Sequence, residues 1–240
     1  MEFPSGRYGR PSLLAQPDSQ IDADTQSAAE ARPNYQVVSQ LIARVSDGAK
    51  PAELAEILKV DPVLCYALMA EVGAAGPVLA KYVTTCKQAI ERLGMAFFSE
   101  LLSGALEHAT KVTTFSEVVR NALIRARFME LMTATMDANK DTGEVYLIGL
   151  FSKLDALLGI PLPDLILPMP FPEEMRSAIL EQAGRTGRLL KFAQTIEVAD
   201  EHGMDFMQTN LHLPSFKVYE AYNEADDWVR EIESQYVTGN

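Results

Sequence analysis

Apolar side chains recur every three or four residues in one segment of this chain after another, and this period most restricts the possible fold. The first such segment contains Tyr35, Val38, Leu41, Ile42 and Val45. Apolar residues at this spacing line one face of an α-helix. The usual signal of a β-hairpin, a turn dipeptide between alternating apolar residues, is missing. The sequence therefore predicts an all-α, multi-helix globule of about ten helices.

The segment from Glu144 to Leu158 is apolar almost all the way round a helix. A helix on the surface needs a polar face, whereas a helix without one is normally buried. We therefore expect one helix here, at the centre of the fold, ending at Gly159. The proline-rich stretch 160–172 follows it, and the last predicted helices cover residues 173–183, 187–201 and 215–236.

The first 33 residues differ in character from the rest of the chain. They contain several prolines and scattered polar residues, with no helical or alternating apolar period. This is typical of a flexible tail. We therefore predict a flexible tail over residues 1–33 and one folded domain over residues 34–236. Neither a secretory signal nor a run of about 18 apolar residues is found, so we expect a cytoplasmic protein without membrane contact.

The two cysteines, Cys65 and Cys86, form no CxxC motif and lie near no cluster of histidines. Such a pair does not predict a zinc site. The interpretation is two buried thiols in a reducing compartment.

The formal net charge of −12 is unevenly distributed. An acidic chain is unsuited to nucleic-acid binding, which needs a basic surface. Residues 197–235 contain ten acids against Lys217 and Arg230, which gives −8 of the total −12. We interpret these acids as solvated outer faces of the last two helices, with the rest of the domain close to neutral.

The common catalytic motifs are missing, including the phosphate loop GxxxxGK[ST] and the nucleophile elbow GxSxG. The three histidines are His108, His202 and His212. His108 falls near a predicted helix end, where a positive charge is favoured, so we expect a capping role. His202, Asp205 and His212 could surround a divalent ion, although their spacing matches no defined metal motif.

Three arginines, Arg120, Arg125 and Arg127, lie in one predicted helix that runs from about Glu117. Guanidinium groups match the geometry of phosphate oxygens, so these residues are candidates for holding a phosphate. The spacings Glu117–Arg120 and Arg127–Glu130 also fit ion pairs within the helix. Both interpretations remain open from the residues alone.

Four segments in this order resemble the HDOD domain. They are Asp61–Met69 (DPVLCYALM), Val83–Gly94 (VTTCKQAIERLG), Leu123–Leu131 (LIRARFMEL) and Ile148–Leu162 (IGLFSKLDALLGIPL). The resemblance covers roughly residues 34–236, and it is strongest to the domain that forms the C-terminal half of EAL-HDOD signalling proteins of the YuxH type. It implies an all-α fold like that of the HD superfamily.

HDOD domains are related to the HD and HD-GYP metal-dependent phosphohydrolases, whose central helix carries a His-Asp pair of metal ligands. On this chain the resemblance places Ser152 and Lys153 at that pair, after Gly149-Leu150-Phe151. The upstream helix, around 119–123, also lacks the histidine of the hydrolases. Because the Lys153 ammonium would repel a cation, the resemblance implies a protein with no catalytic residues, no bound metal and no cofactor.

The resemblance implies a bacterial signal-transduction module that acts by contacting other signalling proteins, in two-component or cyclic-di-GMP pathways. The 33-residue tail stands where an EAL domain would precede, which indicates a stand-alone version. One alternative is a degenerate pocket that binds a nucleotide or phosphate through Lys153 with Arg120 or Arg125. A further alternative is a metallohydrolase built on His202 and His212. The sequence predicts neither the partner nor the oligomeric state.

Overall fold

The computed structural model describes residues 32–76, 83–112, 114–136, 141–198 and 214–236. These residues form ten helices of eight residues or more: α1 (Tyr35–Ser46), α2 (Pro51–Leu58), α3 (Pro62–Ala74), α5 (Cys86–Leu93), α6 (Met95–His108), α7 (Glu117–Met136), α8 (Thr142–Phe151), α11 (Glu173–Leu180), α12 (Gly184–Glu197) and α14 (Ser215–Tyr236). Two helices of five residues are added, α9 (Leu154–Leu158) and α10 (Leu162–Ile166). The predicted all-α fold is confirmed.

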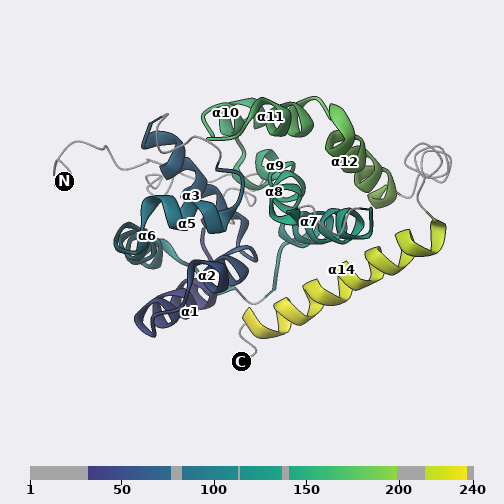
Figure 1. The fold of residues 1–240 in the computed structure, drawn as a ribbon. Coiled ribbons are helices and arrows are strands. Elements are labelled where there is room, and N and C mark those ends of the chain that lie inside the picture. Colours follow the sequence, from purple (N-terminus) through teal and green to yellow (C-terminus); the bar gives the residue numbers. More distant parts are fainter. Residues whose placement is uncertain (1–31, 77–82, 113, 137–140, 199–213, 237–240) are drawn as a thin grey trace.

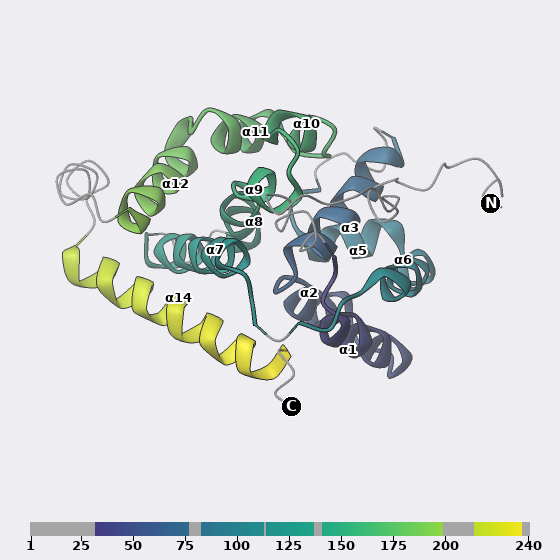
Figure 2. The same cartoon turned by 180° about the vertical axis from the view of Figure 1, so that it is seen from behind.

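The helices gather in two groups that share one apolar core (Figure 1). Helices α1 to α6 form one group, and α7 to α12 form the other, with α7 packed along α8. The opposite view shows the long helix α14 running along α7 on the outside of the fold (Figure 2). Its last residue returns to the start of the domain, where the Asn34 side-chain amide donates to the Tyr236 carbonyl oxygen at 3.3 Å.

Helix α8 is the predicted central helix, and its residues from Val145 to Phe151 are all buried. The prediction of a single helix from Glu144 to Leu158 is wrong, because the chain turns at Ser152 and Lys153 before α9 begins. The Ser152 hydroxyl donates to the Gly149 carbonyl oxygen at 2.6 Å. This local hydrogen bond competes with the helical pattern and helps to end α8 at this point.

Local capping signals place several of the helix starts. Asp61 accepts a hydrogen bond from the Leu64 backbone N–H at 2.9 Å, and Thr85 accepts one from Gln88 at 3.2 Å. Such side chains satisfy backbone donors that the first turn of a helix leaves free. The proline-rich stretch 160–172 was not predicted to contain a helix, but it holds α10, whose Pro163 lies in the first turn, where proline is tolerated.

Asp61 also joins the start of the domain to α3. Its second carboxylate oxygen accepts from the Asn34 backbone N–H at 2.7 Å. Burial raises the pKa of Asp61 from 3.8 to about 6, against the opposing effect of the backbone N–H groups of Asn34, Leu64 and Val63. The folded state thus holds the Asp61 proton more tightly than the unfolded chain does.

This pKa predicts a pH dependence of stability that a variant can isolate. Between pH 3.8 and about 6 the unfolded chain loses the Asp61 proton first, so the Asp61 contribution to stability falls as pH rises. The loss is on the order of 3 kcal/mol, and it is complete above the folded pKa. We expect Asp61→Asn to flatten this decline when urea unfolding is measured from pH 4 to 7. An unchanged slope in the variant would contradict the assignment.

The predicted tail, residues 1–33, lies almost wholly outside the described residues, which begin at Arg32. Pro33 and Asn34 form a short parallel bridge with Thr110, in which the Tyr35 N–H donates to the Thr110 carbonyl oxygen at 3.0 Å. Among the helices described, none combines the length and the apolar character that crossing a bilayer requires.

Candidate functional site

The turn between α8 and α9 carries Ser152 and Lys153, the two residues placed at the degenerate His-Asp position. This turn faces α7 and the end of α12, and each of these two helices contributes one charged side chain. These are Arg125, which is only 4% exposed, and Glu197, which is 15% exposed. We call Arg125, Ser152, Lys153 and Glu197 the charged cluster.

Arg125 is the centre of the charged cluster. Its Nε and Nη2 atoms each lie 2.6 Å from one carboxylate oxygen of Glu197. Its remaining terminal nitrogen, Nη1, donates to the Ser152 hydroxyl oxygen at 2.7 Å. Because the Ser152 hydroxyl gives its own proton to Gly149, its oxygen is free to accept from Arg125. All three guanidinium nitrogens are therefore bound within the protein, in the paired geometry that suits a carboxylate.

Lys153 adds a second positive charge to the charged cluster. Its ammonium nitrogen lies 3.4 Å from the Glu197 carboxylate, and its side chain is 25% exposed. Two cations and one carboxylate give the charged cluster a formal charge of +1. A divalent metal needs several carboxylate or imidazole ligands, and the cations here would repel it. The residues at this position do not fit a metal centre.

A glycine allows these elements to approach. Helices α7 and α8 are in such close contact that a Cβ atom on Gly149 would lie 2.7 Å from the Ala126 Cα. Ala126 follows Arg125 on α7, and Gly149 stands one turn before Ser152 on α8. The close packing at Gly149 therefore brings Ser152 within reach of the Arg125 guanidinium.

The three arginines of α7 do not come together. Arg120 and Arg127 are seven residues apart and lie on the face of α7 toward α14, whereas Arg125 faces α8 and α12. Arg120 binds Asp226 at 2.8 Å and Glu233 at 2.7 Å. Of the phosphate candidates, the structure therefore joins Lys153 with Arg125 through Glu197 and places Arg120 and Arg127 elsewhere.

The predicted ion pairs within α7 are found for one of the two spacings. Arg127 lies 2.6 Å from Glu130 and also reaches Glu224 of α14 at 3.1 Å. Arg120, in contrast, uses both terminal nitrogens on α14, and no pair between Glu117 and Arg120 is seen.

The interpretation of the acids in 197–235 as solvated faces is wrong for several of them. Glu197, Asp226 and Glu233 are each less than a quarter exposed, and each binds an arginine of α7. Ion pairs with arginines of α7 hold these carboxylates between α7 and the helices α12 and α14. No local sequence pattern reveals such pairs. Burial raises the pKa of Tyr222, and the negative charges of Glu197 and Asp226 add to the effect.

Arg120 should therefore contribute to the attachment of α14. We expect Arg120→Ala to lower the free energy of unfolding by about 1–2 kcal/mol, because two partly buried carboxylates lose the guanidinium that joins them to α7. Arg230 is a matched control, since it pairs with the same Asp226 but is 64% exposed. Arg230→Ala should change stability by less than about 0.5 kcal/mol. Urea unfolding at low and high salt checks both values, and equal losses would contradict the prediction.

Of the three histidines, only His108 lies within the described residues. His108 lies in the last turn of α6, as predicted. His202, Asp205 and His212 lie outside the described residues, so the metallohydrolase alternative stays a prediction. Within the described part of the chain, no group of three or more His, Cys, Asp or Glu residues is placed to hold a metal.

Sequence reasoning missed Glu197 as the partner of Arg125, because 72 residues separate the two.

Two known proteins are similar in sequence to most of this chain. Cyclic di-GMP phosphodiesterase CdgJ of Vibrio cholerae is 27% identical over 172 residues, which cover 72% of this chain and 40% of CdgJ. The uncharacterized protein YuxH of Bacillus subtilis is 24% identical over 186 residues, which cover 74% of this chain and 43% of YuxH. The aligned region thus spans less than half the length of each of these two relatives.

A solved structure shares the fold. The response regulator MmoQ from Methylococcus capsulatus superposes with a TM-score of 0.60 at 16% identity, over 81% of this chain and 98% of MmoQ. The model of the HDOD domain family matches residues 33–166, from the bridge at the start of the domain to the end of α10. The resemblance to the HDOD domain is confirmed over residues 33–166, and the chain belongs to the HDOD domain family.

Proposed function

We propose that this chain is a noncatalytic signal-transduction module that acts by contacting other signalling proteins in the cytoplasm. Its membership of the HDOD family and its similarity to CdgJ support a role in signalling. The charged cluster supports the noncatalytic part of the proposal. It holds the Arg125 guanidinium and the Lys153 ammonium at the turn where the resemblance places the metal-binding His-Asp pair of the related hydrolases.

The bonding of Arg125 is the observation that carries this proposal. A hydrolase of the HD type depends on a metal ion to activate water. Among the described residues, the carboxylate at this position is that of Glu197, and it is already held by both Nε and Nη2 of Arg125. To recruit Glu197 as a ligand, a metal would have to break a buried ion pair and leave a guanidinium without its partner.

An activity assay tests the noncatalytic proposal. The purified full chain is incubated with cyclic di-GMP and with other cyclic dinucleotides, in separate reactions containing Mn²⁺, Mg²⁺ or Fe²⁺. We expect product to form at the rate of the reaction without protein. Metal-dependent turnover that is abolished by Glu197→Gln, or by His202→Ala or His212→Ala, would refute the proposal. Turnover of equal rate in all of these variants would indicate a contaminating enzyme.

A second candidate function is a receptor for a phosphate or nucleotide. The excess positive charge of the charged cluster and the partial exposure of Lys153 favour it. The saturated Arg125 opposes it, because an anion would have to displace Glu197. Calorimetry with inorganic phosphate and a nucleotide panel separates the two functions. Binding that Lys153→Ala removes but Arg120→Ala retains would favour the receptor, and no heat at millimolar ligand would exclude it.

A further inference from the structure

The two cysteines of the chain lie side by side in the core, although 21 residues separate them. Cys65 belongs to α3 and Cys86 begins α5, and their sulfur atoms are 3.6 Å apart. Both are free thiols. The Cys65 thiol also lies 3.3 Å from the Leu58 carbonyl oxygen and donates to it. A disulfide needs the two sulfurs to approach to about 2 Å, so only a small movement is required.

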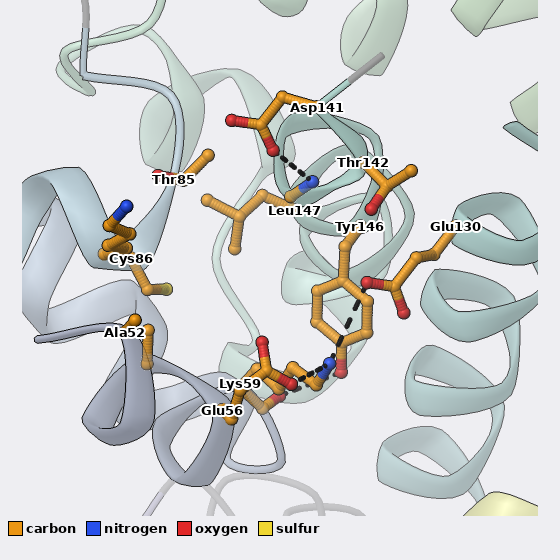
Figure 3. A pocket seen from close by; sticks show the side chains of 13 residues that line it. Ala52, Glu56, Lys59, Thr85, Cys86, Glu130, Asp141, Thr142, Tyr146 and Leu147 are labelled. Carbon is orange, nitrogen blue, oxygen red and sulfur yellow. Dashed lines mark hydrogen bonds and ion pairs between the residues drawn. The ribbon is translucent and has the colours of Figure 1, made fainter. Parts of the chain in front are cut away.

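A cavity of about 200 Å³ gives access to one of these thiols. Residues from α2, α5, α7 and α8 line it, and Cys86 forms part of its wall (Figure 3). Polar groups also border this cavity, including Lys59, Thr85 and Thr142. A space of this size and polarity can admit water or a molecule of similar size, such as hydrogen peroxide.

The two thiols differ in their surroundings. Cys86 is 5% exposed and lines the cavity, whereas Cys65 is fully buried behind it and is not part of the wall. Burial raises the pKa of the Cys65 thiol well above its usual value, and the neighbouring Cys86 adds to the effect. An oxidant that enters the cavity therefore meets Cys86 first, with Cys65 placed to react second.

We propose that Cys86 and Cys65 form a peroxide-sensitive dithiol, which hydrogen peroxide converts into a disulfide between α3 and α5. The Cys86 sulfur attacks one oxygen of hydrogen peroxide and the O–O bond breaks; a sulfenic acid forms, and the other oxygen leaves as water with the Cys86 proton. The Cys65 sulfur then displaces the hydroxyl from the Cys86 sulfur, and the hydroxyl leaves as water with the Cys65 proton. Two thiols are oxidised to one disulfide, and one hydrogen peroxide is reduced to two waters.

Formation of this disulfide would change the hydrogen bonding at the end of α2, next to the cavity. Cys65 would turn from its hydrogen bond with Leu58, the last residue of α2, toward Cys86. The next residue, Lys59, supplies the carbonyl oxygen that accepts from the Tyr146 hydroxyl at 2.9 Å. Oxidation thus links the state of the two thiols to the contact between α2 and α8.

Thiol counting on the full chain tests this proposal. The reduced protein is treated with hydrogen peroxide, denatured and alkylated with N-ethylmaleimide, and its intact mass is measured. Because the chain has only two cysteines, we expect the number of alkylated thiols to fall from two to zero in a monomer. Dithiothreitol should restore both. Methionine oxidation changes the mass in a different way and does not affect the thiol count.

Two variants assign the order of the steps. In Cys65→Ser the sulfenic acid on Cys86 has no partner and should be trapped by dimedone, whereas in Cys86→Ser the buried Cys65 should remain open to alkylation after denaturation. Three results would overturn the proposal: two alkylated thiols after peroxide, a disulfide-linked dimer, or an overoxidised Cys86 beside a free Cys65 in the wild-type chain. The wild-type measurement decides the question even if a variant fails to fold.

Discussion

Glu197→Gln is expected to lower the free energy of unfolding by about 3 kcal/mol. The variant removes the one carboxylate that the described part of the chain places against Arg125, and Arg125 is nearly completely buried. Removing one partner of a buried ion pair leaves an uncompensated charge, which is strongly destabilising. Urea unfolding at neutral pH, monitored by circular dichroism, measures the loss.

A second ion pair provides the control for this prediction. Glu56 lies 2.6 Å from Lys59, but its side chain is 70% exposed. Glu56→Gln should therefore change stability by less than about 0.5 kcal/mol. Replacing Arg125 and Glu197 together by leucine should cost less than Glu197→Gln alone, because no charge is left buried. Similar losses for Glu197→Gln and Glu56→Gln would contradict the structural role of the charged cluster.

Gly149→Ala is expected to lower the free energy of unfolding by about 2 kcal/mol or more. The new Cβ atom would lie 2.7 Å from the Ala126 Cα and 3.1 Å from its nitrogen, so a backbone must move. Overpacking of this kind costs about 1–3 kcal/mol. It outweighs the gain of up to about 1 kcal/mol that alanine brings to a helix interior. Thermal and urea unfolding of the variant test this value.

Gly104 is the matched control, since it lies within α6 and a Cβ atom there would meet no atom within 4 Å. Gly104→Ala should raise stability by up to about 1 kcal/mol, because only the helix propensity changes. The two identical substitutions should thus have opposite signs. A stabilising Gly149→Ala would show that α7 and α8 are not packed as closely as the structure indicates.

Local chemistry made much of this fold predictable from the sequence. Apolar spacing predicted the helices, and the start of α3 at Asp61-Pro62 is also local in origin, because capping depends on neighbouring residues. The apolar segment 145–151 predicted the buried central helix. The break at Ser152 was missed because one of the hydrogen bonds that hold Ser152 comes from Arg125 and forms only once α7 and α8 have packed.

The candidate site was predicted only in part, for the same reason. The resemblance placed Ser152 and Lys153 together, since they are adjacent in the chain. Arg125 was one of three arginines whose partners were undecided, and Glu197 was counted among the solvated acids. The pairing of Arg125 with Glu197 joins α7 to α12, and charge composition cannot reveal which carboxylate a buried arginine binds.

Metal content tests the central claim most directly, that the charged cluster has replaced a metal centre. The purified full chain is incubated with Mn²⁺, Fe²⁺ or Zn²⁺ and dialysed, and the metal retained per chain is measured by mass spectrometry. His202→Ala, His212→Ala and Glu197→Gln variants are treated in parallel. The structure predicts that no metal is retained through Glu197. One or more equivalents of metal that are retained by the wild-type chain and lost in Glu197→Gln would contradict it.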